Sequence, residues 1–121
     1  WRPYLDATLL APSTGCHLRC RVLLDSGADH CVFPEIFTTL LGLNILSLKR
    51  QTTAGVGTTG NLTYYEEVIV DIGNGLRFQT YAGFTAGMDA HGIGLLGQTG
   101  FFENFIVSFD RRNKFFTVEA P

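Results

Sequence analysis

The sequence lacks any long apolar run and any large excess of one charge. No apolar stretch of its 121 residues approaches the roughly 20 residues that span a bilayer. With 9 basic and 11 acidic side chains the net charge is −2, which gives no electrostatic reason to expect nucleic acid or an anionic lipid surface as a partner. Apolar residues make up 45% of the chain and charged residues 17%, so we expect one globular domain over residues 1–121. Because the first residue is Trp1 rather than Met, we expect that this domain has been excised from a longer chain.

Cysteine is also scarce, with Cys16, Cys20 and Cys31 as the three examples. An odd number cannot all be paired within one chain, which favours reduced thiols and a cytoplasmic setting. The nearby His17 and His30 could suggest zinc, but the spacing fits no paired-ligand pattern. Alternation along a strand would send neighbouring ligands to opposite faces. We therefore expect buried or partly buried thiols, no metal and no cofactor.

Helical periodicity is nearly absent from the chain. Short runs rich in Val, Ile, Leu, Phe, Tyr and Thr are separated by Gly, Asn and Asp, which is typical of strands joined by turns. The runs that predict strands cover residues 4–10, 17–24, 46–53 and 62–72. The sequence therefore predicts a small, mostly-β domain with a single core.

Turn residues define the remaining segments. Asn74-Gly75 is a strong hairpin signal and would place Asp71 and Phe78 on paired strands. Apolar residues alternate on both sides of the polar residues 110–113, which predicts a terminal hairpin. The other expected features are a short helix after Pro34, a loose glycine-rich segment over 82–94 and one or two helical turns after Gly97.

Two familiar motifs fail for physical reasons. Residues 55–60, GVGTTG, match the spacing of a dinucleotide-binding loop, but a strand pattern follows where that loop needs the start of a helix. We interpret these glycines as a hairpin tip that allows close backbone approach to a ligand, with a plain surface turn as the alternative. Cys31 is adjacent to His30, but neighbours on an extended chain point apart, so a Cys–His nucleophile is not expected.

One acidic residue stands out at the end of an apolar run. Residues 23–34 read LLDSGADHCVFP, so Asp25 emerges at the edge of a buried strand. An isolated Asp at such a place is usually a turn former. Ser26 adds a hydroxyl that can bond a neighbouring loop, and Gly27 permits close approach of a ligand backbone. Asp29 adds a second acceptor on the same side of an extended chain, so the stretch favours a functional site over a plain turn.

The stretch DSGAD at residues 25–29, the glycine-rich tip at 55–60 and the stretch IGLLGQTGFF at 93–102 occur in that order. Together they resemble the retropepsin-like aspartic proteases, and the likeness runs from Arg2 almost to the end of the chain. The terminal hairpin is more similar to that of the cellular and bacterial members, including the ubiquitin-shuttle proteases, than to the minimal viral ones. The resemblance implies a closed β-barrel that forms half of an acid protease, with a flap hairpin and a two-fold homodimer.

The resemblance also implies a role for each matching residue. Asp25 would be the catalytic acid, and the Ser26 hydroxyl would brace the two active-site loops of the dimer against each other. The residues implied to bind or enclose a peptide are Gly27, Asp29, Gly55, Val56, Gly57, Leu95 and Leu96, with Gly97 behind the loop. Viral members usually carry a basic residue directly after that last glycine, where it pairs with the second Asp. Here the position holds Gln98, so Asp29 lacks that partner and the strength of self-association stays open.

A single carboxylate is not enough for this chemistry. Hydrolysis of an amide without a covalent intermediate needs one group as base and another as acid. In known aspartic proteases two carboxylates about 3 Å apart share one proton, because at a dielectric of about 20 their repulsion is on the order of 5 kcal/mol. No other aspartate in the chain repeats the D-[ST]-G pattern, so the second carboxylate would come from Asp25 of a second copy.

The function expected from the sequence is therefore an aspartic endopeptidase that acts on a peptide or protein substrate as a homodimer. Apolar side chains at Val32, Val56, Leu95 and Leu96 predict hydrophobic residues on both sides of the scissile bond. Two alternatives stay open. One is a catalytically silent dimerisation or peptide-binding module of the same fold, and the other is a small β-barrel binder in which Asp25 only forms a turn.

Overall fold

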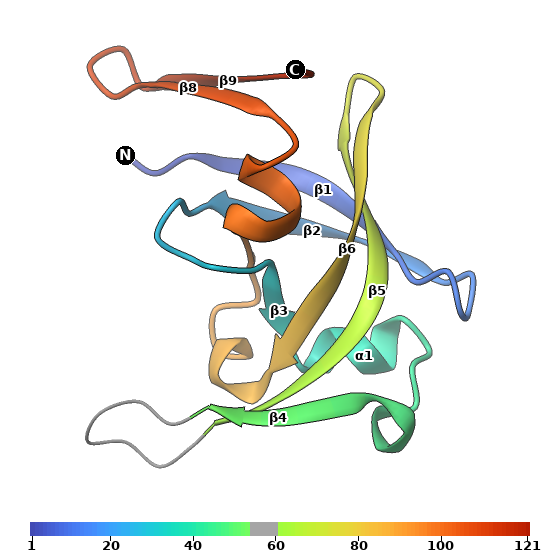
Figure 1. The fold of residues 1–121 in the computed structure, drawn as a ribbon. Helices are drawn as coiled ribbons and strands as arrows, with labels where there is room; N and C mark the ends of the chain where they lie inside the picture. Colours follow the sequence, from blue (N-terminus) through green and yellow to red (C-terminus); the bar gives the residue numbers. More distant parts are fainter. Residues whose placement is uncertain (54–60) are drawn as a thin grey trace.

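The computed structural model describes residues 1–53 and 61–121 and is mostly β (Figure 1). The strands are β1 (Tyr4–Leu10), β2 (His17–Leu24), β3 (Val32–Pro34), β4 (Lys49–Thr53), β5 (Asn61–Gly73), β6 (Leu76–Thr85), β7 (Gly94–Leu96), β8 (Ile106–Asp110) and β9 (Phe115–Glu119). The helical segments are α1 (Ile36–Leu40), the 3-10 turns η1 (Ile45–Ser47) and η2 (Ala86–Met88), and the irregular turn η3 (Gln98–Phe102). No helix in these two ranges is long and apolar enough to cross a membrane.

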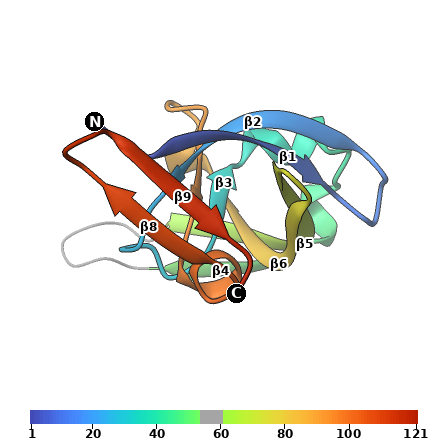
Figure 2. The same ribbon diagram turned by 90° about the horizontal axis from the view of Figure 1, so that it is seen from above.

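The main sheet closes on itself. Its strand order is β1-β2-β7-β3-β6-β5-β4, and β1 also pairs with β5, so that six of the strands form a closed barrel (Figure 2). β4 pairs antiparallel with β5 and forms the last strand of the sheet, outside the six strands of the barrel. β8 and β9 form a separate two-stranded sheet. The predicted mostly-β closed barrel with one or two short helices is confirmed.

The core fills the inside of this barrel. Its largest fully buried side chains are Phe33, Phe84, Phe101, Leu9, Leu41, Leu96, Val22, Val68 and Val70. Phe33 and Phe84 pack with ring centroids 5.8 Å apart, and Phe78 meets Phe101 of η3 at the same distance. η3 therefore delivers an aromatic side chain to the core directly after β7, which fixes the position of the segment between them.

Several strand predictions match the structure. β1 and β2 have the predicted limits, and their seven registered pairs form an antiparallel hairpin. The turn between β5 and β6 contains Asn74 at φ 54° and Gly75 at φ 77°, the left-handed values that an Asn-Gly hairpin requires. β8 and β9 form the predicted terminal hairpin.

Two predictions are corrected at their boundaries. The strand predicted from residue 46 begins at Lys49, because the Asn44 side chain accepts a hydrogen bond from the Leu46 amide and starts η1. The segment 82–94 is not loose throughout, because β6 continues through Thr85. Gly83 belongs to that strand, and a Cβ at this position would lie 2.9 Å from the Thr63 side chain, so a larger residue would be crowded there.

The three cysteines differ sharply in exposure, and all are free thiols. Burial raises the pKa of Cys20 to about 12 and that of Cys31 to about 11, whereas Cys16 is exposed. At pH 8 a thiol of pKa 11 is ionised in about one molecule in a thousand, and the thiolate is the reactive form. We expect iodoacetamide at pH 8 to label Cys16 alone in the native protein and all three after unfolding, as read by peptide mass mapping. Rapid native labelling of Cys31 would contradict this burial.

Candidate active site

Asp25 directly follows β2, at the point where the barrel wall ends. Val22 and Leu24 of that strand are buried, so the polar residues that follow leave the core together. β7 lies between β2 and β3: Leu95 pairs with Leu23 on one side and with Val32 on the other. The loop from β2 to β3 therefore has to pass around the end of β7.

Hydrogen bonds join this loop, residues 25–30, to the segment that leaves β7. The Asp25 amide donates to the Leu96 carbonyl at 3.0 Å. The Gln98 amide donates to the Ala28 carbonyl at 2.8 Å, and the Thr99 amide donates to the Asp29 carbonyl at 2.9 Å. Two stretches about 70 residues apart in sequence are thus held as one unit.

Gly97 lies at the closest approach of the two stretches. A Cβ at this position would be 2.3 Å from the His30 carbonyl oxygen and 2.6 Å from the Ala28 carbonyl oxygen. Real Cβ atoms essentially never approach backbone so closely. The glycine that ends the apolar-apolar-Gly stretch at 95–97 is therefore explained by its contact with the acidic loop.

The Asp25 carboxylate is half-buried and is oriented by its own loop. Its Oδ1 accepts a hydrogen bond from the Gly27 amide at 2.9 Å. Its Oδ2 accepts none from the residues that the structure describes. One oxygen is thus fixed by a turn, and the other is available to a water or a second carboxylate.

The other predicted loop residues are exposed. Ser26 and Gly27 face solvent, and the Asp29 side chain forms no ion pair within residues 1–53 and 61–121. Gln98 does not contact the Asp29 carboxylate. Its side-chain amide instead donates to the Ser26 carbonyl at 2.7 Å, a contact that sequence reasoning missed.

The predicted peptide-binding residues are divided between surface and core. Leu95 is half-buried and, with Leu23, lines a cavity of about 420 Å³ near the end of β2, to which the loop 25–30 itself contributes no residue. Leu96 is fully buried, so it supports the loop from the core and does not line that cavity. Gly55, Val56 and Gly57 lie outside the described residues.

The same cavity contains residues that no sequence motif pointed to. Its remaining lining residues are Arg2, Tyr4, Gly87, Met88, His91 and Ile93. They come from the N-terminus of the chain and from the segment around η2, which the fold brings to the two sides of the Leu23–Leu95 pair. Residues 2 and 91 come together only through the tertiary fold, so no local sequence signal could have shown that they line the same cavity.

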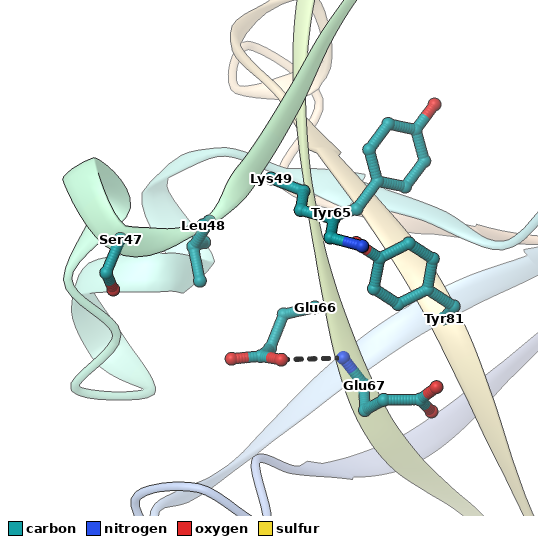
Figure 3. A pocket seen from close by; sticks show the side chains of 7 residues that line it. All are labelled: Ser47, Leu48, Lys49, Tyr65, Glu66, Glu67 and Tyr81. Carbon is teal, nitrogen blue, oxygen red and sulfur yellow. Dashed lines mark hydrogen bonds between the residues drawn. The ribbon is translucent and has the colours of Figure 1, made fainter.

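A larger cavity, of about 530 Å³, lies elsewhere, over β4, β5 and β6 (Figure 3). The Tyr65 and Tyr81 rings beside it stack with centroids 5.5 Å apart. Its lining includes the Glu66 carboxylate, which accepts a hydrogen bond from the Glu67 amide at 3.0 Å. It contains no residue of β2, of β7 or of the loop 25–30, so size alone does not identify the reactive site.

Comparison of the chain with protein-family models, with curated proteins and with solved structures finds no match. Within the described ranges, no three His, Cys, Asp or Glu side chains are grouped so as to hold a metal ion. The functional assignment therefore depends on the residues of the chain themselves.

Proposed function

We propose that this chain is one half of a retropepsin-like aspartic endopeptidase, in which two copies of Asp25 form the catalytic pair. The observation that carries the proposal is the Asp25 carboxylate itself. It is held on one oxygen by the Gly27 amide, its loop is hydrogen-bonded to the end of β7, and a cavity lined in part by Leu23 and Leu95 lies near the end of the strand that precedes it.

The other aspartates support the need for a second copy, because four of them are engaged elsewhere. Asp6 pairs with an arginine at 3.7 Å and Asp71 with another at 3.5 Å. Asp89 Oδ1 accepts the Ile36 amide at the start of α1, and Asp110 caps the β8–β9 turn. Each of these four carboxylates thus has a partner outside the loop 25–30.

The terminal hairpin is the surface on which we propose that the second copy docks. Figure 1 shows β8 and β9 as a separate ribbon above β1, near the N-terminus. Phe109 is 46% exposed and Phe115 is 51% exposed, which is much for phenylalanine. The outer edges of this two-stranded sheet are unpaired among the described residues, and such edges readily accept another strand.

In the proposed reaction the two Asp25 carboxylates share one proton. The ionised member removes a proton from a water as the water attacks the carbonyl carbon of the peptide bond. The protonated member donates to the carbonyl oxygen, which gives a tetrahedral diol. The C–N bond then breaks as the proton taken from water passes to the leaving nitrogen, and a hydroxyl of the diol returns its proton to the other carboxylate, so that the pair again shares one proton. Leu23 and Leu95 would receive an apolar side chain of the substrate in the cavity that they line.

One observation favours a second candidate, a barrel of the same fold without catalysis. The bond from the Gly27 amide to Asp25 Oδ1 is also what an Asp that only forms a turn would make. Sedimentation of the purified chain together with a peptide-library cleavage assay at acid pH separates the two. We expect a dimer that cleaves between apolar residues and is inhibited by pepstatin. A monomer, or a dimer that cleaves nothing, would support the second candidate.

Charge placed on the terminal hairpin tests the docking surface. We expect Phe109→Asp to weaken dimerisation by more than tenfold, because burial of one Phe side chain contributes about 1.5–3 kcal/mol and a buried carboxylate adds a penalty. The measurement is the dimer dissociation constant from sedimentation equilibrium. Leu46→Asp is the matched control, since Leu46 is an 86% exposed apolar residue on η1, outside the hairpin. Equal effects of the two changes would contradict this docking surface.

A further inference from the structure

A chain of hydrogen bonds leads from Gln98 to the Asp25 carboxylate through a single peptide unit. The Gln98 Nε2 group donates to the Ser26 carbonyl oxygen at 2.7 Å. That carbonyl belongs to the same peptide unit as the Gly27 amide, which donates to Asp25 Oδ1 at 2.9 Å. The two bonds therefore engage the two ends of one planar group.

This peptide unit has little else to fix its orientation. Ser26 and Gly27 are both exposed, and glycine allows rotations that other residues resist. A donor on the carbonyl holds the plane of the unit and thereby the direction of its N–H group. Because hydrogen bonds in a chain polarise one another, the same donor also strengthens the bond to the carboxylate.

Gln98 adds a side-chain hydrogen bond to an attachment, between the loop 25–30 and the segment after β7, that is otherwise made by backbone. The bonds from the Asp25, Gln98 and Thr99 amides are made by backbone atoms alone and do not use the Gln98 side chain. Gln98 is also exposed, and its side chain takes no part in the core. Its amide can therefore be altered while the rest of the loop stays attached.

We propose that Gln98 is a positioning residue for Asp25, which acts by holding the Ser26–Gly27 peptide so that the Gly27 N–H stays on Oδ1. The catalytic consequence rests on the proposed function, whereas the hydrogen-bonded chain does not. A neutral side chain thus orders the acidic loop at the position where the resemblance implies a basic residue paired with the second Asp.

The test is a series of variants at this position in the full chain. Gln98→Met keeps the length of the side chain but has no donor, and Gln98→Glu presents only acceptors when ionised. Gln98→Lys restores a donor of sufficient reach. Gln79→Met is the matched control, since Gln79 is an exposed glutamine whose amide meets Glu67 Oε2 at 3.4 Å, on strands outside the loop. The two readouts are the Gly27 amide exchange rate by NMR, and kcat and KM on a cleaved peptide.

In the Met and Glu variants we expect the Gly27 amide hydrogen to exchange about five- to tenfold faster. We expect kcat to fall by a similar factor with little change in KM. A factor of this size corresponds to the loss of one hydrogen bond. The Lys variant restores both values, and the Gln79 control changes neither. An unchanged exchange rate in Gln98→Met, faster exchange with an unaltered kcat, or failure of Lys to restore would each overturn the proposal. If the wild-type chain cleaves no peptide, the proposed function fails, and the exchange rates alone decide whether Gln98 holds the peptide.

Discussion

Asp25→Asn is expected to abolish peptide cleavage while the barrel and the dimer persist. Asn matches Asp in shape, and its Oδ1 can still accept the hydrogen bond from the Gly27 amide that Asp25 accepts at 2.9 Å. The turn is therefore retained. The amide cannot take a proton from water or share one with the other subunit, so the loss in kcat should be at least about 10³-fold.

The measurement combines turnover of a cleaved peptide with sedimentation and thermal unfolding of the same sample. Asp6→Asn is the control, because Asp6 is an exposed residue of β1 that pairs with Arg21 at 3.7 Å, away from the loop 25–30. An exposed pair of this kind contributes little to stability, so the control should behave as wild type. Near-normal turnover by Asp25→Asn would mean that Asp25 only forms the turn.

Mixed dimers sharpen the same prediction. If random dimers form from equal amounts of wild-type and Asp25→Asn subunits, about a quarter carry two aspartates. Activity at fixed total protein should therefore fall to about a quarter. Independent subunits would leave about a half, and dimers that need only one carboxylate would leave about three quarters. Either of the larger values would contradict the shared site.

The long strands could be predicted because their information is local. β1 and β2 each span seven or eight residues, long enough for alternation and for clear turn signals at both ends. The Asn74-Gly75 turn needs no distant partner, since the left-handed backbone angles are a property of the two residues. The acidic loop was also visible in the sequence, as a polar stretch directly after an apolar run.

The arrangement of the site could not be predicted, because it depends on pairing between distant segments. β3 and β7 have three residues each, too few for any periodicity, and they exist as strands because they pair with each other and with their neighbours. The contact of Gln98 with the Ser26 carbonyl follows from that pairing. The resemblance implied only that Gln98 stands where viral members carry a basic residue and that Asp29 lacks that partner. It did not predict the contact that the Gln98 side chain makes instead.

Gly97→Ala is expected to destabilise the protein by about 3 kcal/mol or more and to remove activity. The added methyl group would lie 2.3 Å from one backbone carbonyl oxygen and 2.6 Å from another, and backbone cannot turn aside as a flexible side chain does. Relief requires the acidic loop to move away from β7. That movement would break the bond from the Asp25 amide to the Leu96 carbonyl and displace the carboxylate.

Thermal unfolding and peptide turnover of Gly97→Ala measure the two effects, with an expected fall in Tm of about 10 °C. Gly87→Ala is the matched control for stability, because a Cβ at Gly87 would meet nothing within 4 Å and the residue has no left-handed φ. It should change Tm by little, so that the difference between the variants reports the contact at Gly97 and not the general effect of replacing glycine. If Gly97→Ala were as stable as Gly87→Ala, the loop would not be packed against the end of β7. Packing against β7 would then not be what holds Asp25 at the end of the barrel wall.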